Sequence, residues 1–303
     1  MFKEGIGESG LFASAHPIVT ASYYTVVIGL LMFSNSPPIL ASAILAGLLY
    51  DMLLKGVKSL RNNIAIVLFM TILSVAINVI FTHNGSTVLF YLGNNRFTLE
   101  AAVYGFAMAL MISSVIVWFA SFNVVMTSEK LIYLFGRFAP VLGLTLSMIF
   151  RFVPLLKTRF AMIRDGQKAL GASDAQGFLV KIKRFTKEVS ILISWSLEAS
   201  IESADSMAAR GYGLKGRSSY SLFKFKNSDF LMLALIVVLG SINGAAYAMG
   251  FGRLYYYPVI RAIVKSSSAF GILGYISFLC LLIMPLAMDL VGELKWKKSK
   301  STI

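Results

Sequence analysis

Long apolar runs with few charged residues are the feature that most limits how this chain can fold. A helix needs about 20 mostly apolar residues to cross the hydrocarbon core of a bilayer. The sequence offers six candidates: Ile18–Phe33, Ile39–Leu54, Ile64–Phe81, Leu99–Phe122, Phe230–Met249 and Phe270–Val291. Pro37 and Pro38 break the chain between the first two, which are short enough to be either tilted or paired as a hairpin.

The composition agrees with a membrane protein. Hydrophobic residues make up 57% of the 303 residues and charged residues only 14%, whereas soluble domains carry about 25% charged residues. We therefore expect an all-α polytopic membrane protein with about six spans. A further apolar stretch, Phe138–Leu156, is interrupted by Arg151 and bracketed by Pro140 and Pro154. We expect it to lie in or against the membrane, and the sequence leaves open whether it crosses fully.

The basic residues predict an orientation, because cytoplasmic loops are enriched in Lys and Arg. Half of the 28 basic residues lie between Arg151 and Lys226, and further clusters follow the second span and end the chain. All three clusters fall on one side if both termini are cytoplasmic, although the outer loop Gly250–Ala269 also holds three basic residues. The excess of basic residues on the cytoplasmic side, together with attraction to anionic lipid, accounts for the net charge of +14. Nucleic acid is therefore not expected as a partner. We expect a multi-pass protein of the cell membrane.

The basic insert predicts a division of the chain into three parts: membrane spans over residues 1–156, a cytoplasmic helical insert over 157–227, and membrane spans with a basic tail over 228–303. Two helical arms are expected in the insert, Lys157–Leu170 and Thr186–Arg210. Each arm ends in the pattern Ala-x-Gly, and glycine commonly ends a helix. The two tips are Ala169-Leu170-Gly171 and Ala209-Arg210-Gly211.

The second arm carries small residues at helical spacing, which would let another helix approach closely. This predicts that the two arms cross there, and the alternative is an ordinary amphipathic surface helix. The predicted crossing residues are Ser196, Ser200, Ser203 and Met207. Arg210 is the strongest candidate for contacting a partner, because its planar fork suits a carboxylate. A solvated arginine at a helix end, favoured by the helix dipole, is the alternative.

The sequence also lacks the patterns of several functional classes. It contains no GxxxxGK[ST] phosphate-binding loop, so this chain is not expected to hydrolyse ATP. His16 and His83 lie far apart without ligand-spaced neighbours, and no metal site or resident cofactor is expected. A secondary transporter would need ionisable or unwound sites near the bilayer midplane. The spans offer Asn78 and little else there, because Asp51 and Asp289 lie near the cytoplasmic ends. We expect no catalytic activity from this chain.

A series of motifs then carries a family resemblance over nearly the whole chain. The motifs, in order, are His16-Pro17, FTHNGSTVLFYL (81–92), FTLEAAVYG (97–105), MTSEKLIYLFGRFAP (126–140), RFVPLL (151–156), IRDGQKALG (163–171) and ADSMAARGYG (204–213). Together they resemble the transmembrane T component of energy-coupling factor (ECF) transporters, the family that includes the membrane subunit of cobalt uptake systems. The last motif is the most specific of them.

The resemblance implies a mechanical role for the two arms. As coupling helices they would cross and insert their tips into two cytoplasmic ATPase subunits, which bind the ATP, and Arg210 would be one contact. Leu170 stands where the stricter pattern has an arginine, so Lys168 or Arg164 would supply the charge, or the tip would dock by apolar packing. The implied ATPase contacts are Ala169, Leu170, Gly171, Lys168, Arg164, Ala209, Arg210 and Gly211.

The movement would pass to a membrane S component that binds the substrate, a vitamin or a transition-metal ion. The alternatives to this function are a self-contained secondary transporter and a membrane scaffold protein.

Overall fold

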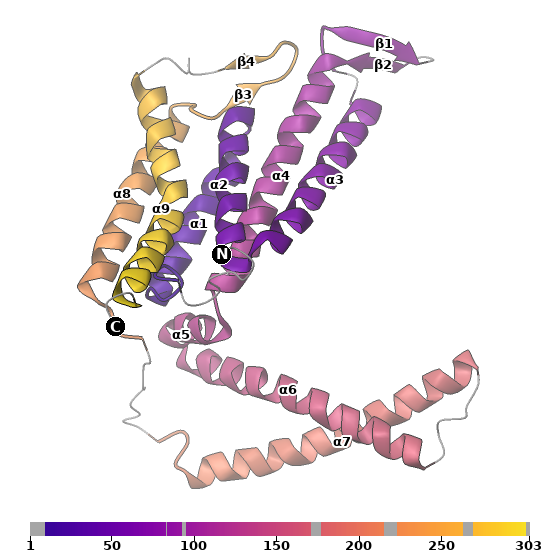
Figure 1. Ribbon diagram of the computed structural model, residues 1–303. Helices are drawn as coiled ribbons and strands as arrows, with labels where there is room; N and C mark the ends of the chain where they lie inside the picture. The colour runs from indigo at the N-terminus through magenta and orange to yellow at the C-terminus, as the bar shows by residue number, and fades with distance from the viewer. Residues whose placement is uncertain are drawn as a thin grey trace. The chain divides into compact units, whose positions relative to one another are not determined.

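The computed structural model describes residues 10–82, 84–92, 95–170, 177–214, 223–262 and 269–300 (Figure 1). The chain forms two compact units, one made of Met1–Thr127 with Phe223–Ile303 and the other of Ser128–Leu222. Four residues considered from the sequence lie outside the described residues: His83, Gly171, and the candidate helix caps Ser173 and Asp174. The predicted division into membrane spans, a cytoplasmic insert and further membrane spans, with boundaries at residues 156 and 227, stays a prediction.

The first unit is a bundle of helices. Prolines open α1 and α2, where the missing amide hydrogen costs no helical hydrogen bond. The helices are α1 (Pro17–Phe33), α2 (Pro37–Lys55), α3 (Val57–Phe81), α4 (Leu99–Val125), α8 (Asn227–Ala248) and α9 (Ala269–Lys300). Helices far apart in sequence pack together here, since α1 contacts α8 and α2 contacts α9.

Within the described residues, six helices are long and apolar enough to cross a membrane. The predicted all-α polytopic class and the number of spans are therefore confirmed, but the set of helices that make up the six differs from the predicted set. Five predicted spans correspond to α2, α3, α4, α8 and α9, and the sixth helix of sufficient length is α6 (Pro140–Ala169). The first predicted span, α1, has only 17 residues. Its face with Val19, Tyr23, Val27 and Leu31 is buried in the bundle.

An aromatic cluster forms the centre of this bundle. Trp118 of α4 is fully buried, stacks on Tyr50 and donates its indole hydrogen to the carbonyl oxygen of Ala43 at 3.0 Å. Tyr23 and Tyr24 of α1 contact each other edge to face and also lie against Trp118. Their hydroxyls donate to the Leu281 carbonyl and to the Ser121 hydroxyl, so buried polar atoms of these large side chains have partners.

Small residues let α3 and α4 approach closely. Ala101, Gly105, Ala109 and Ser113 of α4 recur every four residues and are all buried. A Cβ atom on Gly105 would lie 3.0 Å from the Cα atom of Val75 and 3.1 Å from the Ser74 carbonyl oxygen. Backbone approach at small residues is the common way in which helices associate in lipid. Here the Ser74 hydroxyl also donates to the carbonyl of Gly105 at 3.0 Å.

The two buried aspartates of the bundle have structural partners. Asp51 forms an ion pair with Lys55 at 2.8 Å and accepts hydrogen bonds from Ser59 and Asn63. Asp289 accepts from the Phe12 amide at 2.7 Å and from the Tyr50 hydroxyl at 3.2 Å. Such pairing is what a carboxylate needs in a low-dielectric interior. These groups therefore join elements of the bundle, and a role in binding a transported ion is not needed to explain them.

Two short antiparallel hairpins connect the helices. Strand β1 (Val88–Leu92) pairs with β2 (Asn95–Thr98), and β3 (Leu254–Tyr255) pairs with β4 (Arg261–Ala262). Tyr256 anchors the second hairpin by donating its hydroxyl hydrogen to the Asn35 carbonyl. Burial, with a smaller effect from Tyr104, raises the pKa of Tyr256 to about 12. The hydroxyl consequently stays protonated, and the anchor is insensitive to pH in the physiological range.

Candidate docking site at the helix tips

The second unit consists of three helices, α5 (Ser128–Phe138), α6 (Pro140–Ala169) and α7 (Phe178–Ala209). Helix α6 joins the predicted membrane-associated stretch and the predicted first arm into one continuous helix. Pro154 lies inside it, and the Thr158 hydroxyl donates to the Pro154 carbonyl at 3.1 Å. A threonine hydroxyl in a helix often donates in this way to the carbonyl one turn earlier, whereas the carbonyl that loses its partner at Pro154 is that of Phe150.

Helices α6 and α7 cross each other, as Figure 1 shows. Two contacts mark the crossing: Phe160 lies edge to face on Phe185 at 6.1 Å, and the Arg159 guanidinium lies 4.8 Å from the centre of the Trp195 ring. Glu188, between the two α7 positions, is buried. The two helices are each about 45 Å long at 1.5 Å per residue, and their carboxyl ends lie at opposite ends of the crossed pair (Figure 1).

The predicted crossing residues lie further along α7 than these contacts. Ser196 is partly buried, next to Trp195, and Met207 is partly buried near the end of the helix. Ser200 and Ser203 are exposed, and each hydroxyl donates to the carbonyl four residues earlier at 2.7 Å. Ser196 directly follows Trp195 in the sequence, and Met207 lines a cleft with residues of α6. The role of the set stays a prediction.

The tip of α7 is a well-formed helix cap. Arg210 is the cap residue, and Gly211 follows with a φ of +79°, a left-handed conformation that favours glycine. The Gly211 amide donates to the Ala208 carbonyl and the Tyr212 amide to the Met207 carbonyl, both at 3.0 Å. This pair of bonds is the Schellman motif, which satisfies carbonyls left free at a helix end. The motif explains why Arg210 is followed by glycine in ADSMAARGYG.

The tip of α6 presents an apolar side chain. Leu170 is the cap residue, with 81% of its surface exposed, and it directly follows Ala169. Nearby, Lys168 forms an exposed ion pair with Asp165 at 3.2 Å, and Arg164 lies over the ring of Phe160 at 5.4 Å. Exposed pairs of this kind contribute little stability. Both cations offered as substitutes for the missing arginine are therefore accessible to a partner.

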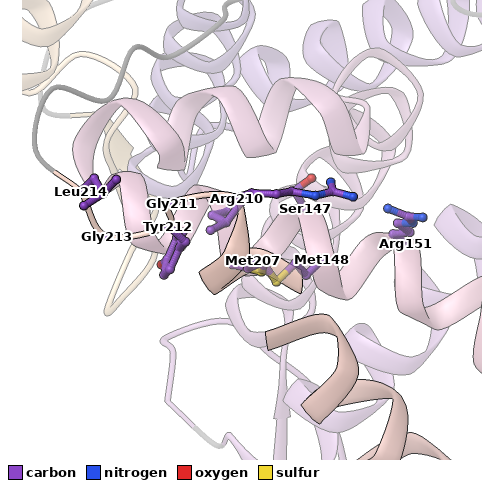
Figure 2. A pocket seen from close by; sticks show the side chains of 10 residues that line it. Ser147, Met148, Arg151, Met207, Arg210, Gly211, Tyr212, Gly213 and Leu214 are labelled. Atoms are coloured by element: carbon purple, nitrogen blue, oxygen red, sulfur yellow. The ribbon is translucent and has the colours of Figure 1, made fainter. Parts of the chain in front are cut away.

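The tip of α7 and the first half of α6 enclose a cleft of about 580 Å³ (Figure 2). Arg210 extends along it toward Ser147 and Arg151, whereas the Met207 and Met148 side chains meet beside it (Figure 2). The cleft is lined by Leu144, Ser147, Met148, Arg151, Met207, Arg210, Gly211, Tyr212, Gly213 and Leu214. Among the residues that the structure describes, this lining includes no acidic side chain.

The sequence predicted Arg210 as a candidate contact residue but did not predict Arg151. Arg151 drew attention only as an interruption of an apolar run, because a separation of 59 residues carries no signal of proximity. The crossing of two long helices brings the two arginines to one cleft. A basic residue at the end of an apolar run was the signal that could have identified Arg151.

His16 has a structural role. Its Nδ1 atom accepts a hydrogen bond from the Ile18 amide at 3.3 Å and so caps α1, and its ring packs on Phe225. This accounts for the His16-Pro17 motif as a helix start. Over the part of the chain that the structure describes, no group of three or more His, Cys, Asp or Glu side chains is placed to hold a metal ion.

Comparison with known proteins identifies the family. No protein-family model matches the chain. The energy-coupling factor transporter transmembrane protein EcfT of Streptococcus equi subsp. equi is 32% identical over 201 residues, which are 61% of this chain and 70% of the relative. The chain belongs to the EcfT family. The EcfT protein of Lactococcus lactis subsp. cremoris is 29% identical over 66% of this chain and 77% of its own length.

A third relative has no assigned activity. The uncharacterized protein MG181 of Mycoplasma genitalium is 32% identical over 115 residues, but these are only 27% of its length. Membership of the EcfT family confirms the resemblance found in the motifs. It makes this chain a transmembrane component of an ECF transporter.

Proposed function

We propose that this chain is a non-catalytic coupling subunit, which transmits ATP-driven movement of two cytoplasmic ATPase subunits to a substrate-binding S component. The substrate would be a vitamin or a transition-metal ion, and the S component rather than this chain would recognise it. The carrying observation is the pair of crossed helices with capped, exposed tips at opposite ends (Figure 1). Two separated tips suit two separate ATPase subunits.

The two tips would dock by different physical means. Arg210 has no ion-pair partner within the described residues, so its guanidinium is available to a carboxylate on an ATPase. Leu170 exposes an apolar surface that would be buried in the other ATPase. Ala169 and Ala209 precede the tip residues and are small enough for a close approach. In this proposal, Lys168 and Arg164 add charge around the apolar tip.

Because the two helices contact each other at the crossing, movement of one tip would be transmitted to the other helix. From Trp195 to the end of α7 the helix extends about 20 Å, and from Phe160 to the end of α6 about 15 Å. Large apolar side chains are exposed along the pair and would face lipid or the S component. They include Phe178, Leu179, Ile193, Leu197 and Ile201.

The test is charge reversal at the α7 tip. Arg210→Glu should lower co-purification of the ATPases and reduce uptake, because losing one member of a charge pair buried at an interface costs about 2 to 5 kcal/mol. Arg137→Glu is the matched control, since Arg137 is an exposed arginine of α5 in the same unit. If Arg210→Glu binds the ATPases and supports uptake as the wild type does, the proposed contact is wrong.

A further inference from the structure

Two guanidinium groups line the cleft between α6 and α7, and no acidic side chain is among the described residues of the lining. The Arg151 and Arg210 side chains both line it and point toward one another in Figure 2, with Ser147 beside them. Neither arginine forms an ion pair with any acidic side chain that the structure describes. Both arginines are exposed, and like charges that line one cleft repel each other. An anion placed between them would remove this repulsion and would accept several hydrogen bonds.

The arginine fork is well matched to a phosphate group. Each guanidinium can donate two parallel hydrogen bonds to phosphate oxygens, and two arginines can share one phosphate or hold two neighbouring ones. The Ser147 hydroxyl supplies one more donor at the same place. The polar side of the cleft, as far as the structure describes it, therefore provides charge and donors but no competing acidic group.

The rest of the cleft indicates where the phosphate comes from. Leu144, Met148, Met207 and Leu214 line it with apolar surface, which a free inorganic anion would leave uncovered. Helix α6 has no charged residue from Pro140 to Phe150, and Arg151 is the first. An arginine within an apolar run can keep its charge at the level of the lipid headgroups because its long side chain reaches toward the interface.

The surface beside the cleft adds a second observation. Val141, Leu142, Ile149 and Phe150 lie on the same stretch of α6, with exposed fractions of 65%, 53%, 48% and 39%. Exposed apolar surface of this extent needs covering by lipid chains or a partner. A lipid bound with its phosphate between the arginines would lay its acyl chains along this stretch.

We propose that the cleft binds an anionic phospholipid, with its phosphate held by Arg151 and Arg210 and its acyl chains against the apolar lining and the uncharged run of α6. Basic pockets between membrane helices bind lipid headgroups in this way. Arg210 also belongs to the proposed ATPase contact, and one guanidinium cannot serve both at once. Lipid occupancy and docking at this tip would then compete.

The experiment measures lipid preference with the full-length protein in detergent. After removal of bound lipid, the protein is titrated with phosphatidylglycerol and with phosphatidylcholine, and the bound lipid is counted by native mass spectrometry. Each basic residue near a membrane surface adds about fivefold to binding of anionic lipid. Arg151→Gln and Arg210→Gln should each lower the preference for phosphatidylglycerol by about this factor, and the double variant by more. Arg151→Lys should keep most of it.

Controls separate the lipid from other anions and from the partner. Arg137→Gln, on α5, should leave the preference unchanged, and elution volume and helix content check that each variant folds. A double variant that retains the wild-type preference would overturn the proposal, as would displacement of the lipid by glycerol phosphate at equal concentration. If Arg151→Gln weakens ATPase co-purification but not lipid binding, the two arginines hold a partner's carboxylate and the lipid proposal is wrong. If only Arg210→Gln loses ATPase binding while both variants lose the lipid preference, the ATPase contact and the lipid site are both supported.

Discussion

The turn that follows Arg210 can be tested with a series of substitutions at Gly211. An L-residue in the left-handed conformation at φ +79° costs about 1 to 2 kcal/mol. A Cβ atom there would also lie 2.9 Å from the Leu214 Cδ1 atom, which is a flexible side-chain end that can move. Since 1.4 kcal/mol is a factor of ten, Gly211→Ala should lower the population of the formed turn about five- to thirtyfold.

Asparagine separates the conformational cost from the steric one. It also adds a Cβ atom, but it adopts the left-handed conformation more readily than alanine. The order of turn stability should therefore be glycine, then asparagine, then alanine. Gly166→Ala in α6 is the control, because nothing lies within 4 Å of the added Cβ atom and alanine favours a helix interior.

Hydrogen exchange at the Tyr212 amide provides the assay. This amide donates to the Met207 carbonyl only while the cap is formed, so its exchange should accelerate in the predicted order. Co-purification of the ATPases should weaken in the same order, if the capped turn presents Arg210. Unchanged exchange at Tyr212 in Gly211→Ala would refute the account of the cap, and unchanged ATPase binding despite faster exchange would refute its link to docking.

Three further predictions concern the α6 tip, the crossing and the bundle. Leu170→Asp should strongly reduce ATPase co-purification, and Leu170→Arg should be tolerated. Binding at this tip should vary less with salt than binding at Arg210, because only exposed charges are screened. Wild-type binding by Leu170→Asp would exclude the tip as a contact. Phe185→Ala and Ser203→Leu distinguish two locations for the crossing: loss of uptake only in Phe185→Ala places it at the ring contacts, whereas loss in Ser203→Leu places it at the serines. Gly105→Leu should lower the stability of the first unit by about 1 to 3 kcal/mol through overpacking, as measured by thermal unfolding, whereas Gly29→Leu on an open face of α1 should not.

The sequence predicted the features that depend on local composition. Apolar runs located five of the six described helices that are long enough to cross a membrane, and prolines at residues 17, 37 and 140 mark helix starts in the structure. Arg210 and Gly211 were recognised as a helix end, because cap chemistry depends on neighbouring residues alone. The start of α7 at Phe178 was missed by eight residues, since a basic patch is compatible with either a loop or a helix.

Features that depend on tertiary contacts were not predicted. The crossing at the serine stripe stays a prediction. The contacts of Phe160 with Phe185 and of Arg159 with Trp195 were not predicted, because any amphipathic helix could carry such residues. Arg151 became a candidate only when α6 and α7 were placed together. The two hairpins were missed because strands of two to five residues give too short a period to recognise.

The hydrogen bond from the Phe12 amide to Asp289 spans 277 positions of the chain. Ribosomes add about 5 to 20 residues per second, so the partner of Phe12 is made on the order of tens of seconds after it. During this interval α1 and the aromatic side chains that surround it have no finished bundle in which to pack. The bundle therefore closes only after its last helix has been synthesised.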